Sequence, residues 1–251
     1  MGRLPVEIAL AGDDQAHRVL MERLADAVLG DGEHLEEQRR FVGDAAGRRI
    51  LPLTRRPARE RAPSGRLVHR NQRLGTEPLG YAAVLVEAAT DLASQADVVL
   101  VLADEDGDRG RKDHLPRARA ALHARGLSRI ALGICDPIAE AWLVALLAKD
   151  RTQRAHALSR ALGIDVSRQP ERLSSRPPDH RRHAKRALAF LLAHRGDDIM
   201  AFPAETPGSD ETDPALAMVS LSLEALCALD GCGLADFVCD LERALSASAS
   251  S

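Results

Sequence analysis

Apolar residues near the start of the chain follow first the two-residue period of a strand and then the period of a helix. The strand is indicated by alternating apolar positions at Leu4, Val6, Ile8 and Leu10. Gly12-Asp13-Asp14 interrupts the alternation, and apolar residues then recur at helical spacing until Gly30. We therefore predict a strand, an acidic turn and a helix as the opening unit.

Two continuous apolar runs indicate strands that are covered on both faces. Val98–Leu102 follows a predicted helix over residues 80–95, and Ile130–Ile134 follows another over about 114–125. A third helix is expected after Pro137, and a short strand at Arg49–Leu53. Strands that alternate with helices predict an α/β fold with a parallel sheet of about four strands flanked by helices.

Beyond residue 150 the periodicity is helical only. One apolar face spans 184–192, a helix is expected from Asp213-Pro214 to about residue 229, and a last face spans 234–245. We expect an α/β domain at 1–150 with an arginine-rich insert at about 39–73, a helical extension at 151–246 and a disordered tail at 247–251.

Composition excludes several classes of protein. No apolar run has the length of a membrane span and no signal peptide is evident, so we expect a cytoplasmic protein without a membrane partner. The cysteines do not suggest a disulfide framework, and Cys227, Cys232 and Cys239 are expected to be buried thiols. His180 and His183 lie among arginines and are interpreted as part of a surface helix rather than a zinc site. With 2% aromatic residues and a net charge of −3, neither a base-stacking platform nor a generally basic nucleic-acid binder is expected.

Positive charge is concentrated in one segment. Residues 39–73 contain eleven arginines and two acids, Asp44 and Glu60. One interpretation is a solvated loop, since prolines and a glycine interrupt the segment. The other is an electropositive rim that binds the phosphates of a nucleic acid. The candidate residues for that rim are Arg48, Arg49, Arg55, Arg56, Arg59 and Arg61.

The strongest chemical signal is the acidic sequence that follows the apolar run at 98–102. Asp104 and Asp106 project to the same side of an extended chain, and Asp108 follows them. Carboxylates this close repel one another, and a Mg²⁺ or Mn²⁺ ion, which prefers oxygen ligands, would remove the repulsion. An EF-hand is excluded because Arg109 stands where its turn glycine belongs. The alternative is a polar turn that only faces water.

Further acidic residues are expected at the same edge of the sheet. Asp13 and Asp14 follow the first strand and are candidates for catalysis, with capping of the next helix as the simpler alternative. Asp136 is interpreted as a helix cap. Glu140, one turn later, is either a metal ligand or a solvated acid in the first turn. Trp142 is expected in the core.

The acidic turn, the D-x-D-G strand end and the later E-A-W helix together resemble a Toprim-type domain. The similarity is to an uncharacterised bacterial Toprim-like family whose members tend to be encoded beside ATPases in phage-defence operons. The matching segments are Ile8–Gly12, Val99–Gly107, Ile134–Leu147 and Cys232–Phe237. The resemblance implies a Toprim-like parallel sheet with a C-terminal helical extension.

The same resemblance implies a nuclease that cleaves the phosphodiester bonds of DNA or RNA and works with a partner ATPase. Its implied cofactor is Mg²⁺ or Mn²⁺, held by Asp104, Asp106, Asp108 and Glu140. Asp13 or Asp14 would complete the ligand shell or accept a proton. One departure is Ala11, which stands where Toprim enzymes carry a glutamate. A homo-oligomer is compatible with this interpretation.

Two other functions stay open. A catalytically silent Toprim-like module that docks on an ATPase, as a sensor or partner, would account for the missing glutamate at Ala11. A haloacid-dehalogenase-type phosphatase would use Asp104 as nucleophile and Asp106 as acid/base. Its later motifs would be Lys185 and Gly196-Asp197-Asp198.

Overall fold

The structure of the chain is a computed structural model. It describes residues 5–12, 14–30, 38–43, 50–53, 73–74, 77–78, 80–105, 110–177, 179–193, 198–204, 223–229 and 231–249. Within these ranges, no helix combines the length and the apolar character that a membrane crossing requires.

A four-stranded parallel sheet forms the centre of the fold and confirms the predicted α/β architecture. The strands lie in the order β2 (Arg39–Val42), β1 (Val6–Ala11), β5 (Val98–Asp104) and β6 (Ile130–Cys135). Ala11 pairs with Val101, so β5 continues past the end of β1 as far as Asp104. A separate antiparallel pair is formed by β3 (Arg73–Leu74) and β4 (Glu77–Pro78).

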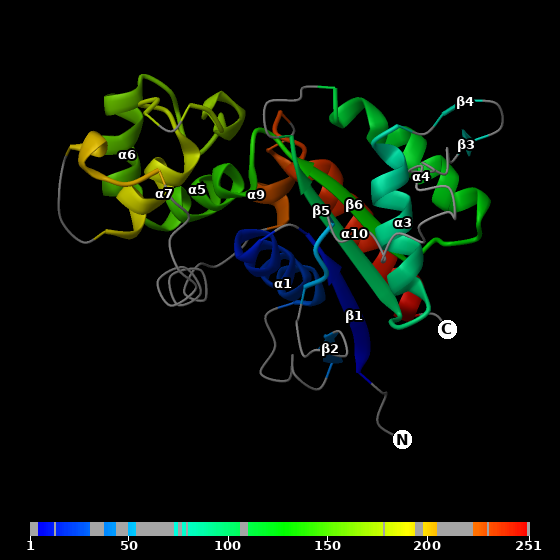
Figure 1. The fold of residues 1–251 in the computed structure, drawn as a ribbon. Helices are drawn as coiled ribbons and strands as arrows, with labels where there is room; N and C mark the ends of the chain where they lie inside the picture. Colours follow the sequence, from blue (N-terminus) through cyan, green and yellow to red (C-terminus); the bar gives the residue numbers. More distant parts are fainter. Residues whose placement is uncertain are drawn as a thin grey trace.

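Helices cover both faces of this sheet (Figure 1). α1 (Gln15–Leu29), α5 (Ala139–Asp150) and α10 (Leu234–Ala249) contribute to the core on one face, together with Leu100 and Leu102 of β5. α3 (Ala82–Ala93) and α4 (Leu115–Ala124) cover the other face, where Val99 and Val101 point. Because successive side chains of β5 enter opposite cores, the strand is apolar at nearly every position.

Several of the remaining helices gather around α5, to one side of the sheet (Figure 1). α6 (Thr152–Leu162), α7 (Ala184–Leu192) and the short η2 (Pro170–Arg172) pack against α5, and η3 (Ile199–Ala201) packs against α7. The short η1 (Lys112–His114) leads into α4, and α9 (Leu223–Cys227) lies against α10. α10 packs on β6 and therefore belongs to the layers of the sheet, although the sequence places it after the segment that surrounds α5.

The identity of the edge strand differs from the expectation. A strand was expected at Arg49–Leu53, yet the edge strand is β2, and Leu51 makes only a single bridge with Ala11. Both arginines of β2 form ion pairs, with acidic side chains of α1 and β1. Charged residues are tolerated on an edge strand, and here they conceal its apolar period.

Several smaller expectations also require correction. Residues 247–249, expected in a disordered tail, form the end of α10. His180 and His183 precede α7 rather than lying on a helix, and His183 is buried. Cys227 and Cys239 are exposed rather than buried, whereas the thiol at Cys232 is buried as predicted. The first part of the helix expected over residues 213–229 falls outside the described residues. Within them, α9 is the helix in that region.

Candidate functional site

The carboxyl ends of β1 and β5 form the point at which the strand order reverses. The chain moves from β1 outward to β2 in one direction, and β5 and β6 lie on the other side of β1. Ligands of open parallel sheets bind at such a point because the loops on either side diverge. Asp104 is the last residue of β5, and its side chain is 18% exposed there.

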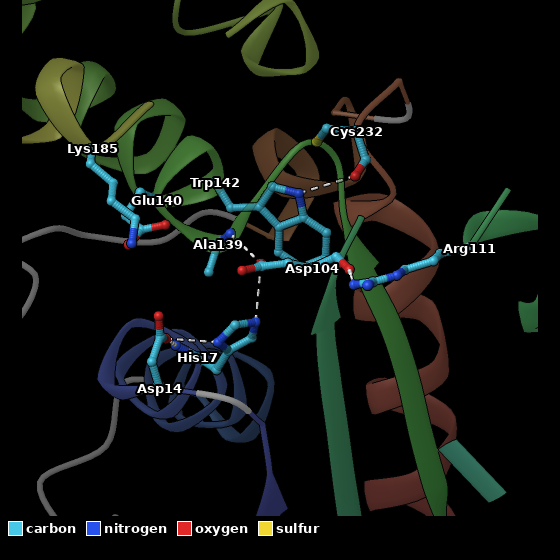
Figure 2. A network of polar contacts seen from close by, with 9 residues as sticks. All are labelled: Asp14, His17, Asp104, Arg111, Ala139, Glu140, Trp142, Lys185 and Cys232. Carbon is cyan, nitrogen blue, oxygen red and sulfur yellow. Dashed lines mark hydrogen bonds and ion pairs between the residues drawn. The ribbon is translucent and has the colours of Figure 1, made fainter. Parts of the chain in front are cut away.

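His17 lies between two carboxylates at this point (Figure 2). Its Nδ1 is 2.7 Å from Asp14 Oδ1, and its Nε2 is 3.1 Å from Asp104 Oδ1. The second contact is too bent for a regular hydrogen bond and is best described as an ion pair. The imidazole is completely buried, whereas the Asp14 side chain is 37% exposed.

Local sequence explains how His17 reaches this position. Asp14 is the N-cap of α1, as the sequence suggested, because its carboxylate accepts a hydrogen bond from the His17 backbone amide. His17 then lies one turn into the helix, directly beneath the extended end of β5. Gly12 makes the approach possible, since a Cβ there would lie 2.7 Å from the His17 Cβ.

Electrostatics fix the charge of the imidazole. Burial alone would lower the pKa of His17, but its contacts with the Asp104 and Asp14 carboxylates raise it to about 10. Burial opposes ionisation of Asp14, yet its contacts with His17 leave the pKa of that carboxyl below its usual value. At neutral pH the site therefore contains a buried imidazolium that neutralises part of the charge of two carboxylates.

Asp104 also caps the helix that follows the next strand. The backbone amide of Ala139 donates to Asp104 Oδ1 over 2.7 Å (Figure 2). This bond satisfies one of the unpaired amides at the start of α5 and places a negative charge at its positive end. The expectation that Asp136 caps α5 is thus wrong: Ile138 is the N-cap residue, and Asp136 instead pairs with Lys112.

The first turn of α5 contributes a second acid to the site. Glu140 is completely buried, and Lys185 of α7 reaches it with its Nζ 3.6 Å from Oε1. The Lys185 charge also acts on Asp14, so the ammonium group belongs to the same cluster. Two residues further along, Trp142 lies in the core as predicted, and its Nε1 donates to the Cys232 carbonyl over 3.0 Å.

The donor atoms of the cluster decide which cation it suits. Asp14, Asp104 and Glu140 offer carboxylate oxygens, the ligands that Mg²⁺ prefers. Cys135, His17 and Asp104 also place one ligand atom each within 4.8 Å of one another. Burial, followed by the charge of Asp104, raises the pKa of Cys135 well above its usual value, so the thiolate that zinc requires is disfavoured. The carboxylates are therefore donors of the kind that Mg²⁺ prefers, but among the described residues only the mixed group brings its ligand atoms within 4.8 Å of one another.

His17 constrains how such an ion can be bound. The two Oδ1 atoms of Asp14 and Asp104 lie on opposite edges of the imidazole ring. Magnesium bonds to oxygen are only about 2.1 Å long, so a single ion cannot contact both of these atoms while His17 lies between them. Neither the His17 contact nor the Ala139 hydrogen bond uses Asp104 Oδ2.

The structure brings three of the predicted site residues together, namely Asp14, Asp104 and Glu140. The other predicted residues lie outside the described part of the chain: Asp13, Asp106, Asp108, Arg48, Arg49, Arg55, Arg56, Arg59 and Arg61.

Sequence reasoning missed His17 and considered Lys185 only as a later motif of the phosphatase alternative. His17 stands three residues after Asp14, the spacing of neighbours on a helix, and this signal could have identified it. The pairing of Lys185 with Glu140 had no local signal, because only packing of α7 against α5 brings the two together. Comparisons of the chain with family models, curated proteins and solved structures found no match.

Proposed function

We propose that this site at the ends of β1 and β5 binds Mg²⁺ or Mn²⁺ and cleaves phosphodiester bonds of a nucleic acid, as a Toprim-like nuclease. The observation that carries the proposal is the position of Asp104, a partly exposed carboxylate at the end of an inner strand where the strand order reverses. Asp14 and Glu140 add negative charge at the same place. A hard divalent cation suits such a set of oxygen donors.

In this proposal Asp104, Asp106, Asp108 and Glu140 hold the ion. The ion polarises the phosphate and lowers the pKa of a bound water molecule. His17 and the Ala139 amide fix the orientation of the Asp104 carboxylate through Oδ1, and Oδ2, which neither contact uses, would be the oxygen that binds the ion.

Two further side chains have roles at the reacting phosphate. Asp14 is ionised at neutral pH and partly exposed, so it can accept a proton from the attacking water, as can Asp13. Lys185 is 30% exposed and offers a positive charge to a phosphate oxygen. The implied setting is a cytoplasmic phage-defence system with a partner ATPase, in which arginines 48–61 would hold the polyanion.

The test is cleavage of plasmid DNA, single-stranded DNA and single-stranded RNA, with Mg²⁺ or Mn²⁺ and with a chelator. Asp104→Asn is the informative variant, because asparagine can still cap α5 but carries no charge. We expect it to lose cleavage by a factor of about a hundred or more while remaining folded. Asp91→Asn, a change at an exposed site on α3, is the matched control and should cleave normally.

Two outcomes would contradict the nuclease. Cleavage that Asp104→Asn leaves unchanged would place the activity elsewhere or in a contaminant. Release of phosphate from small phosphomonoesters, without cleavage of polymers, would instead support the phosphatase alternative.

A silent partner module is the second candidate, and a specific observation favours it. Ala11 is completely buried at the end of β1, so that strand supplies no carboxylate at its last residue. In addition, His17 already provides a positive charge between Asp14 and Asp104. This module would bind no Mg²⁺ in calorimetric titration and would change the turnover of its partner ATPase on mixing. A magnesium heat signal that Asp104→Asn abolishes would exclude it.

A further inference from the structure

A second charged surface lies at the far end of α5. An open hollow of about 640 Å³ is bordered by the last turn of α5, by one side of α6 and by the turn that follows α6. Its ionisable lining residues are Lys149, His156, Arg160, Asp165 and Arg168. Basic side chains therefore outnumber acidic ones around it.

The basic residues are arranged along a helix face. His156 and Arg160 are four residues apart on α6, so they are neighbours one turn apart, and both are exposed. Thr152 precedes them by another turn on the same side. A row of this kind can follow the successive charges of a polymer, whereas a compact anion would need groups that converge on one point.

The turn after α6 places the remaining arginine, Arg168, at the border of the hollow. Gly163 ends α6 in a left-handed conformation. Asp165 then accepts hydrogen bonds from the Ser167 hydroxyl at 2.6 Å and backbone amide at 3.1 Å. The Arg168 Nε is 3.9 Å from Asp165, and its side chain remains 85% exposed. Asp165 therefore offsets the Arg168 charge only in part.

Lys149 adds a half-buried charge at the floor of the hollow. Burial lowers the pKa of its ammonium group. An anion in the hollow would favour the charged form and reverse that shift. Lys149 would thus gain more from a bound phosphate than a fully solvated lysine would.

α5 links this surface to the candidate active site. Glu140 in the first turn and Lys149 in the last are nine residues apart, or about 14 Å along the axis at 1.5 Å per residue. Nine residues are about two and a half turns, so the two side chains lie on opposite faces of α5, whose first turn is buried. The hollow is therefore separate from the candidate active site, and a strand of several nucleotides is needed to contact both.

We propose that the hollow binds the sugar–phosphate backbone of the nucleic-acid strand through Arg160, Arg168, His156 and Lys149. The inference rests on the proposed function, because it assigns to the substrate a second contact remote from the bond that is cleaved. It also places substrate binding on the helices around α5, and not on arginines 48–61 alone.

The test is binding of a long, labelled single-stranded oligonucleotide, followed by fluorescence anisotropy in a chelating buffer at several salt concentrations. Arg160→Glu/Arg168→Glu is the informative variant, since both side chains are exposed and the fold does not depend on them. We expect about ten-fold weaker binding at low salt and a salt slope smaller by about 1.4–1.8, the loss of two phosphate contacts. Arg125→Glu/Arg181→Glu changes two exposed arginines outside the hollow by the same charge and should bind nearly as the unmodified chain does.

Three outcomes would overturn the inference. They are unchanged binding by Arg160→Glu/Arg168→Glu, equal weakening by the two double variants, and displacement of the oligonucleotide by inorganic phosphate at equal concentration. The assay contains no divalent ion, so it does not depend on cleavage, and Asp104→Asn should bind normally. Loss of binding in the first variant together with full cleavage by Asp104→Asn would retain the binding surface and reject the nuclease site.

Discussion

His17 Nε2 lies 3.1 Å from Asp104 Oδ1 and joins the first turn of α1 to the end of β5. The contact is buried on the histidine side and partly exposed on the aspartate side. Because Asp104 and Asp14 contact the two ring nitrogens, the pKa of His17 is raised to about 10 and the imidazole stays protonated at neutral pH. A positive charge is thus built into the crevice by the protein itself, at the place where the sequence had suggested a metal ion.

The His17 contacts predict a pH dependence of stability. The pKa of His17 is about 10 in the folded protein and 6.5 for an ordinary histidine, so the folded state binds the proton more tightly than the unfolded state. The stabilisation is complete below pH 6.5 and is lost as the pH rises toward 10. Urea unfolding across this window should show a decrease in the free energy of unfolding, up to about 5 kcal/mol.

The control for this prediction is a comparison of two histidines. His17→Gln should be less stable near neutral pH and should lose most of the decrease above pH 6.5. His156→Gln, at an exposed position on α6, should keep the pH dependence of the unmodified chain. An unchanged slope in His17→Gln would mean that the imidazole is not held as an imidazolium.

Asp104 should contribute to stability as well as to the proposed chemistry. Asp104→Ala removes the cap of α5 and one partner of the His17 charge, which should lower the free energy of unfolding by about 2–3 kcal/mol. Asp104→Asn keeps an acceptor for the Ala139 amide and should lose less. Denaturant unfolding of the two variants separates the capping effect from the charge effect, and equal losses would show that capping contributes little.

The effects of Lys185 and Glu140 on stability should be coupled, although the two residues belong to different helices. A double-mutant cycle with Lys185→Met and Glu140→Gln should give a coupling free energy of about 1 kcal/mol, because the lysine is partly solvated and its Nζ is 3.6 Å from Oε1. Of the two single variants, Lys185→Met should have the lower free energy of unfolding, since it leaves the buried Glu140 carboxylate without the charge of this partner. Additive effects of the two substitutions would show that the pair does not interact in solution.

Trp142 provides a direct optical probe of the core behind the site. Trp142→Phe should cost about 1 kcal/mol, because the Cys232 carbonyl that accepts from the indole also accepts from the Asp136 amide and so keeps one partner. Trp142 is the only tryptophan, so the fluorescence of the unmodified chain should be that of a buried indole and should shift to longer wavelength on unfolding. A solvent-exposed spectrum in the native state would contradict the packing of α5 on the sheet.

The sequence alone determined the architecture of the α/β part. The runs at 98–102 and 130–134 indicated strands buried on both faces, and α1 and α4 followed from their apolar period and from Gly30 and Gly126 at their ends. Local capping was readable too, since Asp14 precedes the first apolar turn of α1. These features depend on neighbours in the chain, and neighbours are what a sequence displays.

Tertiary structure decided how the charges pair. Asp136 had the local position of a helix cap, yet Asp104 from another strand took the Ala139 amide, because β5 extends beyond β1 and ends beside α5. Burial of His17 between two carboxylates and delivery of Lys185 by α7 likewise depend on how helices pack on the sheet. The energy of a buried charge depends on its distances to the groups packed around it. These groups come from distant parts of the chain, so the local sequence does not show those distances.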